Sequence, residues 1–527
     1  MNSFIKFSLY LLVFLQFNAT SFAFEHNDSH VHFLEYNPKI VKQNLHQKKP
    51  YFLLFAAEWC HWCRVFNEKT LVNQKVYSFL NKNFVNIFID ADIHTGAYQK
   101  YKAKGVPFTV FLNPNTSEYF KYSGTLYAVS FLEVIQDVIQ NVKQGKSVDG
   151  EELFTFKYTP PTKFNKETLD KLRNTYIKGV LDNFDTEEYG VGNGEKTILP
   201  ETFLYLIKYS KGENRQNSFM LISETLKKAI GNIYDPIEGG FFRYAETDDW
   251  DVPHFEKMAG LNAGTILLLY KMNEEIANPK FVKVAQRTTN YLIKTLYDED
   301  TGTFLSFQEA DTSYYFLNET HRKNVKPPLI ISKVFTDHLA VTLTYLIDVL
   351  DYSNNVILKK KIIRSLDFLS KMILNNKQIF HFYTIKEKQW GGKSGLQDHV
   401  LLAKLFMRAV VKFQNESYRK TFSKIIKFSK LNYFDEEKQI FVDPELDTND
   451  YEYLMAMNGD IVLALMAQSK NSSNRKHNQV KSIITYFSGL HEFLEDKFWD
   501  RKSWDFLERT APFLSSADSF MAVQSNL

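Results

Sequence analysis

The chain of 527 residues contains only two cysteines, Cys60 and Cys63. A disulfide between them would close a very short loop, which removes little chain entropy from the unfolded state. The stability of the fold must therefore come from side-chain packing, for which 44% hydrophobic and 15% aromatic residues provide ample material. The cysteine pair is left free for chemistry.

An excess of one charge is also lacking. The 64 basic and 61 acidic residues are mixed along the chain and give a net charge of +3. Nucleic-acid binding normally needs a basic face or stripe, so no nucleic-acid partner is expected.

Long apolar runs are scarce as well. The run from Phe7 to Phe17 is shorter than the roughly 18–20 residues that span a bilayer, so no stable membrane insertion is expected. A single Lys6 precedes it and Ser21-Phe22-Ala23 follows it, a pattern typical of a cleavable signal peptide. We expect residues 1–23 to be removed, with a mature start near Phe24 and a secreted or periplasmic protein. A short membrane anchor is the alternative.

The region around the cysteines alternates strands and helices. The predicted order is a buried strand, the Cys60–Cys63 pair, a helix, two more strands and a closing helix: Tyr51–Ala57, Val65–Leu80, Asn83–Asp90, Gly105–Leu112 and Ser130–Lys143. This order places Cys60 at a helix N-terminus, where the dipole and free N–H groups favour a thiolate. Residues 24–150 are therefore predicted to form one α/β domain, thioredoxin-like in its order of elements.

The segment AEWCHWC, with Val106-Pro107 further along, resembles the thioredoxin superfamily. The resemblance implies that Cys60 is an exposed attacking thiolate and Cys63 a buried resolving thiol. It also implies a cis bond before Pro107 and a site flanked by Trp59. One departure is Leu54, which stands where thioredoxins bury a carboxylate, so proton transfer at Cys63 would fall to Glu58, Lys69 or water.

Two other interpretations of the cysteine pair are a zinc site and an inactive fold. A zinc site needs three or four ligands and no second CxxC is present, although His61 could contribute. An inactive thioredoxin fold that merely retains both cysteines is the other. We expect redox activity, with no metal and no cofactor.

After a linker at residues 151–164, residues 165–527 are predicted to be mainly amphipathic helices. A short phrase recurs between them: an aromatic residue, Asp, then an apolar residue six positions after the Asp. Its Asp-equivalent positions are 185, 235, 298, 376, 435 and 500, with Asn at 376. Such recurrence indicates an array of one repeated unit. Six helical hairpins predict an (α/α)6 toroid, and an irregular helical array is the alternative.

The second repeat, residues 234–264, has the greatest density of reactive side chains. We expect it to bind a sugar or peptide ligand through Asp235, Arg243, Tyr244, Trp250, His254 and Glu256, with Arg243, His254 and Glu256 facing a central cavity. Each also has a structural explanation, such as an ion pair between Glu256 and Arg243.

The stretch GGFFRYAETDDWDVPHFEKM, together with CHWC, resembles the spermatogenesis-associated protein 20-like family. The resemblance implies a thioredoxin domain followed by a six-hairpin toroid akin to sugar epimerases and glycosidases. Phe335-Thr336-Asp337-His338 departs from the Trp-Asn-Ala expected in that family, which would change the chemistry of the cavity.

Three functions remain open. The first is a thiol-disulfide oxidoreductase with a protein thiol or disulfide partner, in which the toroid binds the client. The second is a carbohydrate-active epimerase or hydrolase, for which Asp235, Glu256, Asp337 and Asp398 are candidate carboxylates. The third is a non-catalytic binding scaffold.

Overall fold

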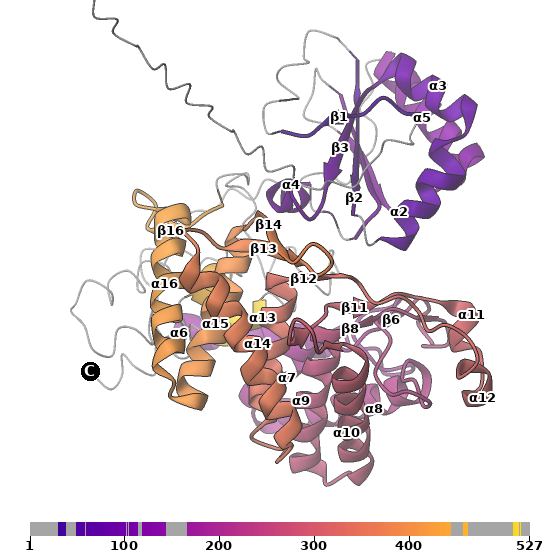
Figure 1. Cartoon of the computed structure of the whole chain (residues 1–527). Helices are drawn as coiled ribbons and strands as arrows, with labels where there is room; N and C mark the ends of the chain where they lie inside the picture. Colours follow the sequence, from indigo (N-terminus) through magenta and orange to yellow (C-terminus); the bar gives the residue numbers. More distant parts are fainter. Residues whose placement is uncertain are drawn as a thin grey trace, which may run out of the picture.

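A computed structural model describes residues 30–37, 40, 49–57, 60–101, 103, 105–113, 119–143, 166–443, 457–461, 510–515 and 517. Figure 1 shows an α/β part, coloured indigo and purple, above a larger helical part that runs from magenta to orange. The predicted signal peptide and linker lie outside the described residues. No helix among the described residues is both long and apolar enough to span a bilayer.

The N-terminal part is a five-stranded sheet with helices on both faces. Its strand order is β1-β3-β2-β4-β5, in which β2 runs parallel to β3 and antiparallel to β4. Its elements are β1 (Leu34–Glu35), β2 (Tyr51–Ala56), α2 (His61–Phe66), the π-helical turn η2 (Asn67–Leu71), α3 (Gln74–Asn83), β3 (Val85–Asp90), α4 (Thr95–Lys100), β4 (Phe108–Leu112), β5 (Tyr119–Ser123) and α5 (Ala128–Lys143).

Strand β2 is central because every one of its residues is buried. Side chains alternate between the faces of a strand, so Phe52 and Leu54 join the core that includes residues of α2, α3 and α5. Tyr51, Leu53 and Phe55 join the core on the opposite face, with α4. The continuous apolar run in the sequence thus has the predicted two-sided burial.

The predicted single helix Val65–Leu80 is wrong in detail, because the chain breaks after η2. Asn73 has an extended backbone and its side chain accepts a hydrogen bond from the Lys75 N–H. This N-cap begins α3 as a separate helix, since Asn satisfies a backbone donor that would otherwise be free.

The C-terminal part consists of paired helices joined by short strands. Its elements are α6 (Lys166–Asp182), α7 (Pro200–Tyr209), α8 (Gly212–Asn232), β6 (Tyr244–Ala245), β7 (Pro253–His254), β8 (Lys257–Met258), α9 (Ala259–Ile276), α10 (Pro279–Thr295), β9 (Tyr297–Asp298), β10 (Thr303–Phe304), β11 (Phe307–Gln308), α11 (Thr312–Tyr315), α12 (Glu319–Arg322), β12 (Lys333–Phe335), α13 (Thr336–Val349), α14 (Val356–Asn375), β13 (Phe380–Thr384), β14 (Gln389–Lys393), α15 (Leu396–Phe413), α16 (Glu416–Tyr433), β15 (Phe434–Asp435) and β16 (Ile440–Phe441).

Helices α7, α9, α13 and α15 form consecutive neighbours along an inner layer, and α8, α10, α14 and α16 pack as the second member of each pair. Helices α9 and α13 are buried on nearly every face, as an inner layer requires, whereas α10 carries a single apolar stripe. Gly264 permits the close approach of α9 to α7, because a Cβ there would lie 2.7 Å from Pro200. This alternation of inner and outer helices is that of an (α/α) toroid.

The recurring aromatic-Asp phrase forms small antiparallel turns, as the repeat predicts. Phe184 bridges Val191 and Tyr234 bridges Phe241, while β9 pairs with β10 and β15 with β16. The weak copy at Asn376 differs, because β13 that follows it pairs with β12 and β14 in a three-stranded sheet. The copy at Trp499-Asp500 lies outside the described residues.

Candidate functional site

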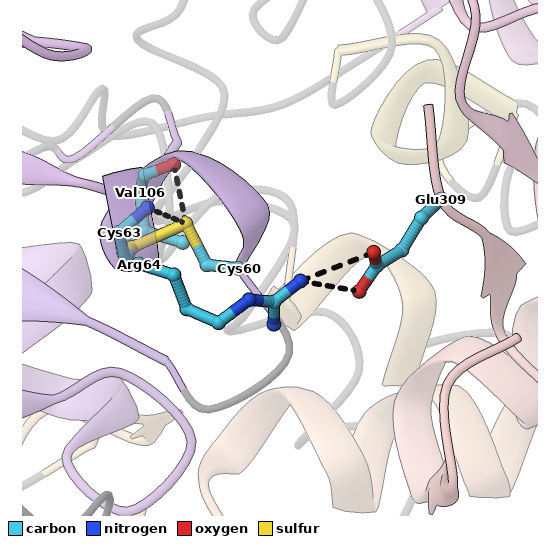
Figure 2. The surroundings of a disulfide bond; sticks show 5 residues. All are labelled: Cys60, Cys63, Arg64, Val106 and Glu309. Carbon is cyan, nitrogen blue, oxygen red and sulfur yellow. Dashed lines mark hydrogen bonds and ion pairs between the residues drawn. A yellow bond between two sulfur atoms is a disulfide. The ribbon is translucent and has the colours of Figure 1, made fainter. Parts of the chain in front are cut away.

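Cys60 and Cys63 form a disulfide at the start of α2, with their Cα atoms 5.2 Å apart. The Cys63 N–H donates to Cys60 Sγ over 3.0 Å, so the sulfur itself caps the helix. Figure 2 shows this contact together with the backbone oxygen of Val106, which lies 3.2 Å from the same sulfur. A disulfide sulfur has no proton to donate, so the second contact becomes a hydrogen bond only in the thiol form.

The peptide bond between Val106 and Pro107 is cis, which confirms that prediction. It precedes β4, which pairs with β2, and this pairing brings the Val106-Pro107 segment beside the disulfide. The arrangement joins residues 46 positions apart in the sequence.

The predicted difference in exposure between the two cysteines is wrong. Cys60 and Cys63 are each only 4% exposed, because both pack into the core formed by α2, α5 and β2. Trp62 between them is 44% exposed. Trp59, predicted to flank the site, lies outside the described residues. Leu54 is buried in the same core, so the strand position before the disulfide is apolar, as the sequence indicates.

The helix that begins at the disulfide contacts the toroid. Arg64, next to Cys63, donates through Nη2 to both carboxylate oxygens of Glu309 at 3.2 Å (Figure 2). A second ion pair joins the parts, between Asp92 just after β3 and Lys333 of β12, at 3.5 Å. Both contacts come from the edge of the sheet where β2 and β3 end, so this edge is held against the toroid's short strands.

Four of the six residues predicted to bind a ligand lie together on the β6–β7 hairpin and the residues beside it. Arg243 pairs with Glu256 at 2.8 Å. Tyr244 stacks on His254 with ring centroids 4.7 Å apart, and His254 Nδ1 lies 3.3 Å from Glu246. Burial raises the pKa of Tyr244 to about 12, which keeps its hydroxyl protonated at neutral pH.

The other two predicted residues, Asp235 and Trp250, leave the candidate ligand-binding set because both are fully buried. Asp235 lies 2.7 Å from Lys257 and 2.8 Å from Arg322. The indole N–H of Trp250 donates to the carbonyl oxygens of Glu188 and Tyr189. Both side chains hold turns of the toroid together.

The structure also brings together a group that sequence reasoning identified only in part. Asp337 and Asp398 were candidate carboxylates, whereas His381 was missed. One potential ligand atom from each of the three lies within 4.8 Å of the others, and all three side chains are buried. The available signals were local ones: Asp337 and Asp398 each stand in the first turn of a predicted helix, and His381 alternates with apolar residues in a strand.

The structure therefore defines a class of protein: a thioredoxin-like domain followed by a helical toroid. A family model described as a protein of unknown function, DUF255 (Thioredox_DsbH), matches residues 14–155. The chain is similar to spermatogenesis-associated protein 20 of Rattus norvegicus, with 24% identity over 293 residues. That alignment covers 50% of this chain and 37% of the rat protein, and the human protein aligns equally well. The chain thus spans less than half of these relatives.

Two solved structures resemble the toroid. One is a D-mannose isomerase, with a TM-score of 0.53 and 9% identity, covering 68% of this chain and 100% of that chain. The other is a sugar epimerase from a ruminal bacterium, with a TM-score of 0.50 and 12% identity, covering 66% and 98%. At these identities the likeness establishes the fold alone, which is the predicted (α/α)6 toroid.

Proposed function

We propose that the protein is an exported thiol-disulfide oxidoreductase that acts through Cys60 and Cys63, with the toroid binding its client. The observation that carries the proposal is the position of Cys60 Sγ, which accepts the Cys63 N–H at the beginning of a helix and lies beside the cis-proline segment. The donor aimed at the sulfur and the helix N-terminus favour a thiolate, whereas the Val106 carbonyl oxygen and burial favour the thiol; we propose that the first two effects prevail. We therefore expect the pKa of Cys60 in the reduced protein to be well below the ~8.5 of a free thiol.

The exchange conserves atoms and electrons. The Cys60 thiolate attacks one sulfur of a client disulfide, forms a mixed disulfide and expels the other client sulfur as a thiolate. Cys63 then loses its proton to solvent and attacks Cys60 Sγ, which re-forms the Cys60–Cys63 bond and releases the second client thiolate. The client gains two electrons and the protein loses two; the reverse sequence oxidises a client dithiol.

We propose that the toroid presents the client to the disulfide. The ion pairs of Arg64 with Glu309 and of Lys333 with Asp92 hold the sheet edge that carries the disulfide against the toroid's strands. A client segment that binds on the β6–β7 hairpin, beside Arg243 and Glu256, is proposed to reach Cys60.

Trapping variants test the proposal. The Cys63→Ala protein should form a mixed disulfide that it cannot resolve, so exported proteins incubated with it should appear as covalent adducts that dithiothreitol dissolves. The matched Cys60→Ala protein keeps one thiol at the same burial and should trap nothing. In the reduced protein, Cys60 should be alkylated by iodoacetamide faster than Cys63 at pH 6. Equal alkylation rates from pH 5 to 9, with no adducts from Cys63→Ala, would refute the oxidoreductase function.

Export is a separate part of the proposal and rests on the pattern of residues 1–23. N-terminal sequencing of the protein from its native host should give a start near Phe24. Retention of residues 1–23 on a membrane-held protein would contradict cleavage.

A carbohydrate-active toroid is the second candidate, supported by its fold likeness to the sugar epimerase and the D-mannose isomerase. Incubation with D-mannose or cellobiose, followed by chromatography of the sugars, tests it directly. Conversion that persists in the Cys60→Ala protein would establish a sugar activity independent of the disulfide. If neither sugar is converted, client binding remains the proposed role of the toroid.

A further inference from the structure

Asp337, His381 and Asp398 converge from three separate elements of the toroid. They lie in the first turn of α13, in β13 and in the first turn of α15, and their exposed fractions are 7%, 6% and 1%. One carboxylate oxygen of each Asp and one ring nitrogen of His381 lie within 4.8 Å of one another. A buried pair of carboxylates is costly unless a cation accompanies it.

The carboxylates are held in place by neighbouring N–H donors. Asp337 accepts from the His338 backbone N–H at 2.8 Å and from Gln397 Nε2 at 3.0 Å. Asp398 Oδ2 accepts from the Gly395 N–H at 2.9 Å. Each oxygen keeps a second lone pair after one such bond. Outer donors of this kind orient the ligands of metal ions.

The charge inside the cluster is not balanced by the imidazole alone. His381 Nδ1 lies 2.9 and 3.0 Å from the two oxygens of Asp398. Even a ring protonated on both nitrogens would carry one positive charge between two buried carboxyl groups.

A neighbouring group supplies an independent observation. Within the described part of the chain, Nδ1 of His338 is buried and has no hydrogen-bond partner. A buried ring nitrogen without a partner calls for an explanation, such as an ion or its bound water.

We propose that Asp337, His381 and Asp398 bind one divalent transition-metal ion, with two carboxylate oxygens and one imidazole nitrogen as ligands. Mixed nitrogen and oxygen donors suit Zn²⁺ or Mn²⁺. The ion takes the place of the His381 proton and balances both carboxylates. Ligand atoms around one zinc lie about 3–4 Å apart, since each stands about 2.0–2.2 Å from the metal, so binding requires a side-chain movement of about 1 Å.

Isothermal titration with Zn²⁺ tests the site in the full-length, tag-free protein after dialysis against EDTA. The protein is kept in its disulfide form, because reduced Cys60 and Cys63 could themselves bind zinc. We expect one ion per chain. His381→Gln should abolish binding, and Asp337→Asn, which preserves the shape of the side chain, should weaken it at least 100-fold. Gln397→Ala removes only an outer donor and should weaken binding roughly 10- to 100-fold.

The matched control is His254→Ala, which removes a histidine that also lies beside a carboxylate, Glu246, but belongs to the β6–β7 hairpin. This protein should bind Zn²⁺ as the unaltered chain does. Visible absorption bands from bound Co²⁺ in the unaltered protein give a readout that needs no variant to fold. No stoichiometric binding of Zn²⁺, Mn²⁺ or Co²⁺ by the unaltered protein, or equal affinity in the His381→Gln protein, would overturn the proposal. His381 and Asp398 would then be a structural ion pair. Either result is independent of the trapping experiment on the cysteines.

Discussion

Replacing Asp235 with Asn tests the reassignment of this residue from ligand binding to the stability of the toroid. Asp235 is fully buried, and so is Lys257, whose Nζ lies 2.7 Å from it. Arg322 approaches with Nη1 at 2.8 and 3.1 Å and has a side chain only 5% exposed. One carboxylate thus offsets two cations that have almost no contact with water.

Asn has the same shape and can still accept the hydrogen bond from the Ile237 N–H, which is 3.0 Å long. The change removes the charge and replaces Oδ2, which accepts from Lys257 and Arg322, with an NH2 donor that faces them. Breaking a buried ion pair from one side costs about 3–5 kcal/mol, because the remaining charge is buried without compensation. Glu238 lies 3.5 Å from Arg322 and offsets part of that loss. We expect Asp235→Asn to lower the free energy of unfolding by about 3 kcal/mol.

Asp435→Asn is the matched control, because Asp435 occupies the corresponding position in another repeat. It accepts from the backbone N–H groups of Glu437 and Lys438 at 2.9 Å. Its side chain is 29% exposed and its cation, Lys438, is 3.7 Å away. A surface pair of this kind is worth about 0–1 kcal/mol. Urea unfolding followed by far-ultraviolet circular dichroism measures both variants, and equal destabilisation would refute the reasoning.

The buried ion pairs of Asp235 also predict how the stability of the protein depends on pH. Burial alone would raise the pKa of Asp235, but Lys257, the Ile237 N–H and Arg322 lower it below the ordinary value of 3.8. A carboxyl with a lowered folded-state pKa stabilises the protein fully above its unfolded pKa, and that stabilisation is lost as pH falls through the folded value. The stability difference between the unaltered and Asp235→Asn proteins should be constant above about pH 5 and shrink below about pH 4.

Two other predictions concern a turn and the contact between the two parts. Gly240→Ala should destabilise the toroid more than Gly192→Ala. Both glycines have a positive φ, but a Cβ at position 240 would lie 2.7 Å from the Tyr291 ring, whereas a Cβ at position 192 would have no atom within 4 Å. Calorimetry compares the melting temperatures of the two variants, and equal values would contradict the close packing at Gly240. Glu309→Gln should change the free energy of unfolding by about 1 kcal/mol or less. It should nevertheless increase the rate at which dithiothreitol reduces the Cys60–Cys63 disulfide by up to about fivefold, the ratio that 1 kcal/mol represents. The control Glu299→Gln removes an exposed carboxylate that pairs with Lys361 and Arg364, and identical reduction rates for all three proteins would show that the Arg64–Glu309 contact does not limit access.

The sequence by itself determined the features that depend on neighbours along the chain. The two-sided burial of β2 follows from an uninterrupted apolar run, and the toroid turns follow from a phrase in which Asp accepts backbone N–H groups two and three residues ahead. The pairing of Cys60 with Cys63 and the cis bond at Pro107 also agree with the prediction. Local spacing and backbone preference suffice for these features, because the interacting groups are close in the chain or belong to a recognisable motif.

Tertiary structure decided which polar side chains are buried and with what partners. The sequence alone predicts a ligand-binding carboxylate at Asp235, whereas the structure shows it paired with Arg322, 87 residues away. The sequence alone predicts one exposed and one buried cysteine, whereas the packing of α2 against α5 and β2 buries both. His381 gains its significance only when β13 sets it between the first turns of α13 and α15. Burial and the neighbourhood of opposite charges depend on contacts between distant segments, and no local pattern of residues records those contacts.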